Sequence, residues 1–344
     1  WTRRGAPAYR GATGTGAGQG AGRIDGSLLH DARADAGVAA DSLNFCMSRV
    51  SANLLLSIVA LIWGSAFVAQ SYGMAHVAPM TFTGVRFLIG AFVVAPLIWM
   101  EWGALSRQGR LPQYSDAMRI VGLGFLLGLG AAMQQIGIAG TSVTNAGFLT
   151  ALYIPLVPVM GWLILRHLPH WPVWLAGLAC VFGAFLLSGA DLQIIGDGDL
   201  WVMASAIPWA LHVLLVGRVA HRMEAPFLVA GGQFAICGLL ATLWALAFEP
   251  VSFQGLLAAT GALLYTGVFS VGIAFTAQVV AQRYTHAADA AIVLSSETLF
   301  AAMFGYVLMG DRITTTGLLG CALILASLVA VQVIPLAKKS ASTC

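Results

Sequence analysis

Charged residues are scarce in this chain. Only 9% of its 344 residues are Asp, Glu, Lys or Arg, and 59% are hydrophobic, whereas a soluble domain carries about 25% charged residues. So few charges cannot cover the surface of a water-soluble fold. The composition therefore excludes an ordinary soluble domain and predicts an integral membrane protein.

Lysine and sequence motifs for enzymatic chemistry are also lacking. The only lysines are Lys338 and Lys339, and a phosphate-binding P-loop needs a lysine directly after its glycine run. ATP-driven transport by this chain alone is therefore not expected. Neither HExxH nor GxSxG occurs, so the hydrolase sites that these motifs form are not indicated. We predict no enzymatic activity, no catalytic residues and no nucleic-acid partner.

Cysteine is present but shows no pattern. The sequence contains no CxxC or Cys/His spacing of the kind that holds a metal or a disulfide framework, so we predict no metal and no cofactor. We interpret the cysteines as small side chains that fill space. They are Cys46, Cys180, Cys237, Cys321 and Cys344.

Residues 1–46 differ from the rest of the chain. They are rich in Gly, Ala, Arg and Asp, and the first methionine is Met47. The stretch has no apolar core of a secretory signal peptide. It is either a disordered tail or a non-native extension with translation beginning at Met47, and we favour the second interpretation.

Ten apolar runs of about 20 residues follow, which is the length that spans a hydrocarbon core of about 30 Å. Arginine and lysine predict their orientation, because they concentrate in cytoplasmic loops. With the N-terminus in the cytoplasm, the loops between runs and the C-terminal tail carry nine of these residues on the cytoplasmic side and only Arg312 on the outer side. We therefore predict a multi-pass protein of a bacterial inner membrane with both termini cytoplasmic. The runs are 51–70, 80–100, 118–138, 143–165, 172–190, 199–217, 226–247, 256–281, 287–309 and 313–335.

The two halves of the apolar region resemble each other. A Pro, a polar residue and a Phe recur 147 residues apart, as Pro79, Arg86 and Phe87 and then as Pro226, Gln233 and Phe234. Five helices per half is an odd number, so the second half must enter the membrane from the opposite side. The predicted fold is all-α, with ten transmembrane helices as two inverted five-helix repeats. The predicted boundaries are 47–190, 191–335 and a cytoplasmic tail, 336–344.

Four stretches resemble the EamA-type ten-helix permeases of the drug/metabolite transporter superfamily. The resemblance covers about residues 51–335 and implies two five-helix halves around a central cavity. It also implies export or exchange of amino acids or related metabolites. The stretches are ALIWGSAFV (60–68), VRFLIGA (85–91), AGFLTALYIPLVPVMGWLIL (146–165) and SSETLFAAMFGYVLMGDRIT (295–314).

Two ionisable residues are predicted to lie within membrane spans. Glu297 falls near the middle of run 287–309, where a charge is costly. It is either a proton carrier or substrate-amine site, or a neutral acid bonded to Ser295, Ser296 or a backbone carbonyl. Arg86 lies roughly 10 Å into its helix. It either anchors a substrate carboxylate or an acid, or extends its side chain to the lipid headgroups.

Several uncharged residues complete the candidate substrate or proton pathway. Trp63 and Trp209 hold related positions in the two halves and either stack on a substrate or serve as packing and interface residues. His212, one turn after Trp209, is either a proton relay or a structural residue. Other polar residues in apolar spans need a wet cavity or another helix. The ones predicted to belong to the pathway are Gln134, Tyr153 and Gln233.

Prolines interrupt two of the predicted helices, which is typical of transport sites. They are Pro155 and Pro158 in run 143–165 and Pro208 in run 199–217.

We predict a secondary transporter that exports a small metabolite, such as an amino acid, by alternating access. The alternative is a membrane-embedded enzyme acting on a lipid, which would need a His, Asp or Glu cluster at one face. The expected partners are a small molecule and the lipid bilayer; proton coupling and a homodimer are left open.

Overall fold

The computed structural model describes residues 47–166, 171–187, 196–310, 312 and 314–341, and for 331–341 the backbone only. The predicted extension 1–46 lies outside the described residues. Every regular element in the described part is helical. Helices occur at each of the ten predicted apolar runs, because long apolar stretches in lipid satisfy their backbone polar groups internally.

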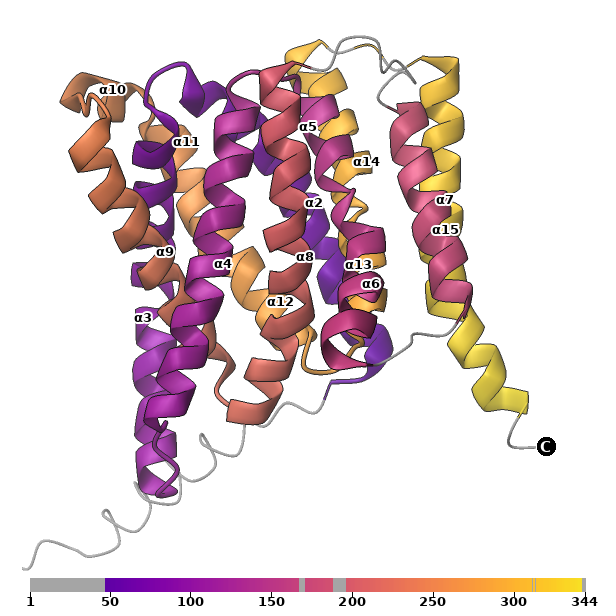
Figure 1. The fold of residues 1–344 in the computed structure, drawn as a ribbon, viewed down its shortest axis with the longest axis horizontal. Coiled ribbons are helices and arrows are strands. Elements are labelled where there is room, and N and C mark those ends of the chain that lie inside the picture. Colours follow the sequence, from indigo (N-terminus) through magenta and orange to yellow (C-terminus); the bar gives the residue numbers. More distant parts are fainter. Residues whose placement is uncertain (1–46, 167–170, 188–195, 311, 313, 342–344) are drawn as a thin grey trace, which may run out of the picture. The chain divides into compact units, whose positions relative to one another are not determined.

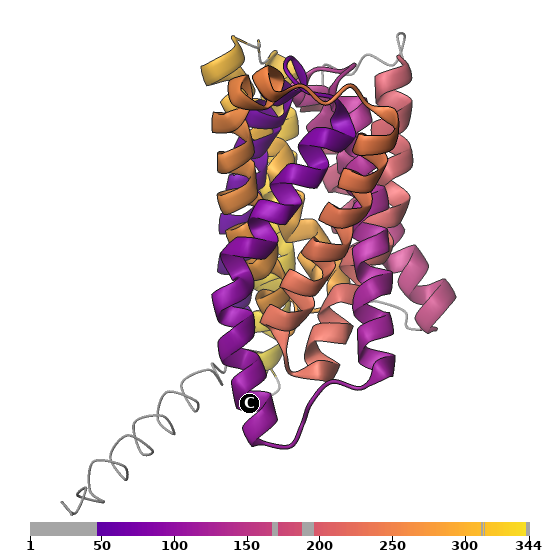
Figure 2. The same cartoon turned by 90° about the vertical axis from the view of Figure 1, so that its left-hand side faces the viewer.

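The helices run side by side along one common direction (Figures 1 and 2). In chain order they are α2 (Arg49–Met74), α3 (Pro79–Arg107), α4 (Tyr114–Ile138), α5 (Val143–Thr150), α6 (Tyr153–Leu165), α7 (Trp171–Leu187), α8 (Asp197–Met223), α9 (Pro226–Phe248), α10 (Phe253–Ala258), α11 (Thr260–Tyr265), the π-helix η1 (Thr266–Phe275), α12 (Thr276–Ala281), α13 (Ala287–Leu294), α14 (Glu297–Phe304), the π-helix η2 (Gly305–Met309) and α15 (Thr315–Ala341).

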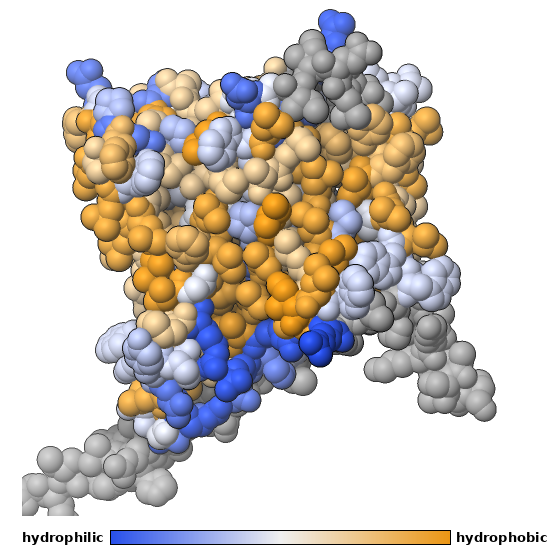
Figure 3. Space-filling model, viewed as in Figure 1, coloured by the Kyte–Doolittle hydropathy of each residue, from blue (hydrophilic) through white to orange (hydrophobic). Residues whose placement is uncertain are grey.

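Eight helical segments of the described chain are long and apolar enough to cross a membrane, and two further apolar helices, Trp171–Leu187 and Thr315–Ala330, are shorter. Apolar side chains form a broad band across the face drawn in Figure 3, with hydrophilic residues above and below it. The predicted all-helical, multi-pass architecture is confirmed. The count of ten membrane spans and the inverted repeat stay predictions.

Two spans are each divided into two helices. The predicted run 143–165 forms α5 and α6 with a break at Ala151 and Leu152, and the run 287–309 forms α13 and α14 with a break at Ser295 and Ser296. The two breaks therefore lie 144 residues apart, at matching places in the two halves. Each break brings the start of a second helix into the interior of the bundle.

One of these breaks is explained by a proline, because Pro155 has no N–H to donate to the carbonyl of Ala151, four residues earlier. Pro158 lies inside α6, after the break, and Pro208 lies inside α8, which continues unbroken. The expected interruption of run 143–165 is therefore present, one helical turn before Pro155, and the one expected at Pro208 is absent. The second break, at Ser295, follows no proline and was not predicted.

Helices of the first half pack against helices of the second, as in the pairs α3 with α9, α4 with α8 and α7 with α15. The α3–α9 pair is antiparallel and is fixed by reciprocal caps. Glu249, just after α9, accepts hydrogen bonds from the backbone N–H groups of Met80 (2.8 Å) and Thr81 (2.7 Å) at the start of α3. Glu101, near the end of α3, accepts from the backbone N–H of Leu228 (2.7 Å) at the start of α9. A carboxylate at a helix N-terminus satisfies unpaired N–H groups and complements the helix dipole.

Candidate functional site

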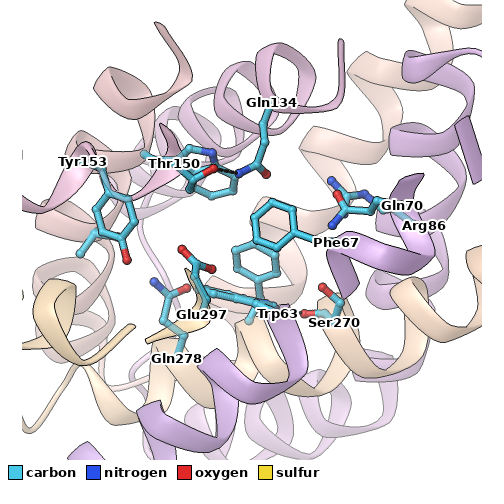
Figure 4. A pocket seen from close by; sticks show the side chains of 13 residues that line it. Trp63, Phe67, Gln70, Arg86, Gln134, Thr150, Tyr153, Ser270, Gln278 and Glu297 are labelled. Carbon is cyan, nitrogen blue, oxygen red and sulfur yellow. Dashed lines mark hydrogen bonds between the residues drawn. The ribbon is translucent and has the colours of Figure 1, made fainter. Parts of the chain in front are cut away.

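A cavity with a volume of about 40 Å³ lies in the interior of the bundle (Figure 4). It collects residues from both halves of the chain, and six of the eight predicted pathway residues are among them. The lining consists of Trp63, Phe67, Gln70, Arg86, Gln134, Thr150, Tyr153, Trp209, Val213, Ser270, Phe275, Gln278 and Glu297.

The Glu297 carboxyl group is buried and faces this cavity. Glu297 is 4% exposed and is the first residue of α14. The neighbouring hydroxyls do not bind it, because Ser295 Oγ donates to Ile292 O (2.6 Å) and Ser296 Oγ donates to Val293 O (2.7 Å). No described residue forms a hydrogen bond to the Glu297 carboxyl group, so its oxygens remain available to a ligand or to water.

Close packing positions this part of α14. A Cβ atom added to Gly64 of α2 would lie 2.4 Å from Phe300 Cβ, 2.8 Å from Ala301 N and 2.9 Å from Glu297 O. Only glycine leaves room for the backbones of α2 and α14 to approach this closely. Gly64 thereby allows α14, which begins at Glu297, to lie directly against α2.

Gln278 is the second group of the cavity that has no partner. It is 1% exposed, and both its Nε2 and its Oε1 are buried without a hydrogen-bond partner among the described residues. Gln134, 144 residues earlier, instead donates from Nε2 to Thr150 Oγ1 (2.9 Å). Figure 4 shows the Gln278 amide beside the Glu297 carboxyl group. These adjacent groups offer a donor and several acceptors to one ligand.

Tyr153 holds the place in the first half that Glu297 holds in the second. Each is the first residue after the break of a divided helix, Tyr153 in α6 and Glu297 in α14. The Tyr153 hydroxyl donates a weak hydrogen bond to Ala291 O (3.4 Å), in α13. The two helix breaks thus face the same cavity from opposite halves of the chain.

Arg86 is the cation of the cavity. It is 3% exposed, so its side chain does not reach the headgroups, and Nη1 donates to Gln70 Oε1 (2.8 Å). Its Cζ lies 5.1 Å from the centroid of the Phe87 ring and 5.8 Å from that of Phe82, distances at which aromatic faces attract a cation. Among the described residues, no carboxylate forms a salt bridge with Arg86, and its Nε is buried without a partner.

Aromatic rings form the remainder of the wall. Phe275 lies between the two tryptophans, with its ring centroid 4.5 Å from that of Trp63 and 5.9 Å from that of Trp209. Trp63 Nε1 donates to Ser270 O (3.2 Å) in the π-helix η1. Trp63 and Trp209, which were predicted to hold related positions in the two halves, therefore both contact the Phe275 ring.

Two of the predicted residues lie outside the lining. His212 and Gln233 are fully buried, and their Nε2 and Oε1 atoms are 2.8 Å apart. The His212 ring meets that of Trp209 edge-on, with centroids 6.0 Å apart. They form a polar contact behind the aromatic wall, and a relay role for His212 stays a prediction.

The predicted pathway left out seven residues of the lining, which are Phe67, Gln70, Thr150, Val213, Ser270, Phe275 and Gln278. Gln70 had a usable signal, because it is a polar residue in an otherwise apolar run. The two phenylalanines had none, because phenylalanine is common throughout these helices. In the described part of the chain, no group of three or more His, Cys, Asp or Glu side chains is arranged to hold a metal ion.

A bundle of long apolar helices around an interior cavity lined by aromatic and polar side chains is the architecture of a multi-pass membrane protein. The model of the EamA-like transporter family matches this chain twice, over residues 50–189 and 196–332. The chain therefore belongs to the EamA-like transporter family. The predicted family is confirmed.

Relatives and one solved structure agree with this placement. An "Uncharacterized transporter" of Archaeoglobus fulgidus is 28% identical over 286 residues, which cover 83% of this chain and 87% of the relative. "Uncharacterized transporter YoaV" of Bacillus subtilis is 27% identical over 77% of this chain and 91% of its own. A crystal structure at 18% identity covers 83% of this chain and 98% of its own with a TM-score of 0.67, which supports the fold. These names indicate a membrane transporter rather than an enzyme.

Proposed function

We propose that this protein is a secondary transporter that exports a small zwitterionic or amphipathic metabolite, such as an amino acid, by alternating access. One cavity holds both an arginine, Arg86, and a carboxyl group, Glu297. A zwitterion matches this pair, with its carboxylate on the guanidinium group and its amine on the carboxyl group. The rings of Trp63, Phe67 and Phe275 suit an apolar side chain between the two ends.

The observation that carries the proposal is that three polar groups of the cavity, those of Glu297, Gln278 and Arg86, are not fully satisfied by described residues. The side chains of Glu297 and Gln278 form no hydrogen bonds with described residues. The described residue that accepts a hydrogen bond from the Arg86 side chain is the neutral Gln70. Buried polar groups without partners are costly and rare in structural roles. In a transporter this cost is explained, because a ligand satisfies the same groups when it binds.

Proton coupling through Glu297 is part of the proposal. A carboxyl group in a membrane interior favours its neutral form until water or a cation reaches it. The same residue can therefore exchange a proton for a substrate amine.

The proposal also places the protein in a bacterial cytoplasmic membrane with both termini inside, which rests on the arginine distribution of the loops. The proposed inverted repeat is supported by the antiparallel α3–α9 pair with its reciprocal caps.

A membrane enzyme is less well supported. The cavity is lined by a single carboxyl group and no histidine, whereas acid–base chemistry on a lipid usually needs a proton donor and acceptor within reach of each other.

Uptake into proteoliposomes tests the function. Parent protein should accumulate at least one member of a panel of labelled amino acids when a pH gradient is imposed. Glu297→Gln should fold, since the amide keeps the size of the neutral acid, but should lose gradient-driven accumulation while keeping substrate exchange. Glu224→Gln, on the surface, is the matched control and should behave like the parent.

Two outcomes would contradict the proposal. Full gradient-driven accumulation by Glu297→Gln would remove the proton-carrier role from this residue. Absence of transport for every amino acid and amine of the panel, with folded protein in sealed vesicles, would remove the proposed substrate class.

A further inference from the structure

A cluster of three polar side chains ties the start of α5 to the start of α8. Asp199 Oδ1 accepts hydrogen bonds from Thr141 Oγ1 (2.5 Å) and Asn145 Nδ2 (2.6 Å). Asp199 is 8% exposed. We call Thr141, Asn145 and Asp199 the Asp199 cluster. The α4 and α8 backbones touch beside it, because a Cβ on Gly198 would lie 2.8 Å from Gly137 O.

A second cluster ties the start of α13 to the start of α2. Arg49 Nη2 lies 2.6 Å from Asp289 Oδ2, and Thr285 Oγ1 donates to Asn53 Oδ1 (3.2 Å). Asp289 is 5% exposed and Asn53 is 3% exposed. We call Arg49, Asn53, Thr285 and Asp289 the Asp289 cluster.

The clusters occupy equivalent positions in the two matched halves. Thr285 follows Thr141 by 144 residues, Asp289 follows Asn145 by the same interval, and Asp199 follows Asn53 by 146. Each cluster holds the first segment of a divided helix, α5 or α13, against the N-terminal part of a long helix. The two clusters lie at opposite ends of the bundle, since α5 and the start of α8 are at the top of Figure 1 and α13 and the start of α2 are toward the bottom.

The central cavity lies between these two ends and is too small for a metabolite. Its volume of about 40 Å³ leaves room for a few water molecules. A larger cavity of about 610 Å³ lies at the end of the Asp289 cluster, where Thr285 and Asp289 line it, and it extends to Val213, which also lines the central cavity. Admission of a substrate therefore requires helices to separate at one end.

We propose that the Asp199 cluster and the Asp289 cluster are the two gates of the transporter, each holding one end closed and opening alternately. The proposal rests on the proposed transport function, but it assigns roles to residues outside the substrate cavity. Hydrogen bonds suit such a role, because each is worth about 0.5–1.5 kcal/mol and can break on the time scale of a transport cycle. Opening either gate moves the first segment of a divided helix, which leads directly to Tyr153 or Glu297.

Cysteine accessibility tests the assignment without a known substrate. The full chain, with its native cysteines replaced by alanine, carries Ser270→Cys in the cavity wall as a reporter. A membrane-impermeant methanethiosulfonate is added to right-side-out or to inverted vesicles. Thr141→Val with Asn145→Ala should raise the labelling rate about tenfold from the end of the Asp199 cluster only. Arg49→Gln should do so from the opposite end only.

Arg119→Gln, which removes a surface ion pair with Asp116, is the control and should leave both rates at the parent value. Should the double variant fail to fold, Asn145→Ser removes one of the same bonds and should give a smaller increase from the same end. Unchanged labelling in folded gate variants, or an increase from the same end in both, overturns the gate assignment even if transport is observed. Opposite-end increases support it even if the amino-acid panel shows no transport.

Discussion

The Arg86 guanidinium group donates to the side-chain oxygen of Gln70 over 2.8 Å. A neutral amide thus accepts the hydrogen bond that a carboxylate would take in a structural ion pair. Among the described residues, no carboxylate compensates the positive charge of Arg86 in the wall of the cavity, which fits a substrate carboxylate as its partner.

Replacing Arg86 should weaken the binding of substrates that carry a carboxylate. Because a hydrogen bond to a charged group contributes about 1.5–3 kcal/mol, Arg86→Gln should raise the apparent KM by about 10- to 100-fold. An amine that lacks the carboxylate should bind parent and variant equally. The measurement is uptake of both compounds into proteoliposomes, with Arg119→Gln as the surface control. Equal KM values for the zwitterion in parent and Arg86→Gln would contradict the anchoring role.

Gly64 should not tolerate a larger side chain. Gly64→Ala places a Cβ atom 2.4 Å from Phe300 Cβ, so α2 and α14 must separate, at a cost of about 1–3 kcal/mol. The expected result is a lower melting temperature in detergent. Gly122→Ala is the matched control, because a Cβ there meets nothing within 4 Å, and better helix propensity should leave its stability equal or slightly higher. Equal melting temperatures for the two variants would show that the α2–α14 contact adjusts.

The cap on α3 should stabilise the fold. Glu249→Ala removes the acceptor of the Met80 and Thr81 N–H groups and of Thr81 Oγ1, and the loss of a helix cap costs about 0.5–2 kcal/mol. Glu249→Gln keeps one oxygen and should lie between parent and alanine variant. Thermal unfolding in detergent measures the difference. If both variants melted like the parent, water would be replacing the carboxylate at the helix start.

The surface ion pair of Glu224 should add a small stability that depends on pH. The hydrogen bond and the charge of Arg110 hold the pKa of the Glu224 carboxyl below its ordinary value. A lowered pKa in the folded state gives a stabilisation that is present above the unfolded pKa of about 4.3 and is lost as the pH falls through the folded value.

The size of this effect is limited by solvent, since the Glu224 side chain is 54% exposed, and exposed pairs contribute less than about 1 kcal/mol. Glu224→Gln should therefore lower the melting temperature slightly at about pH 7 and not at all at about pH 3. A difference from the parent that grew on acidification would contradict the sign of this contribution.

Local composition is enough to predict a helical membrane protein and the positions of its helices. Hydropathy and the scarcity of charge are properties of local composition, so ten apolar runs could be located within a few residues. The depth of Glu297 within its span could be predicted as well, because it depends on the number of residues between Glu297 and each end of run 287–309. Four of the predicted pathway residues, Arg86, Gln134, Tyr153 and Glu297, line the cavity because polar residues in apolar spans must turn toward one another or toward water.

Which helix faces meet depends on the packing of the whole bundle. These helices are apolar on nearly every side, so no amphipathic stripe marks the inward face. Helix rotation therefore depends on packing, which brought Gln70 and Phe275 to the cavity and left His212 and Gln233 outside its lining. The division of two spans into separate helices also depends on packing. Ser295 and Ser296 hydrogen-bond to carbonyls of the preceding turn, a local pattern that becomes a helix break facing Tyr153 only within the assembled bundle.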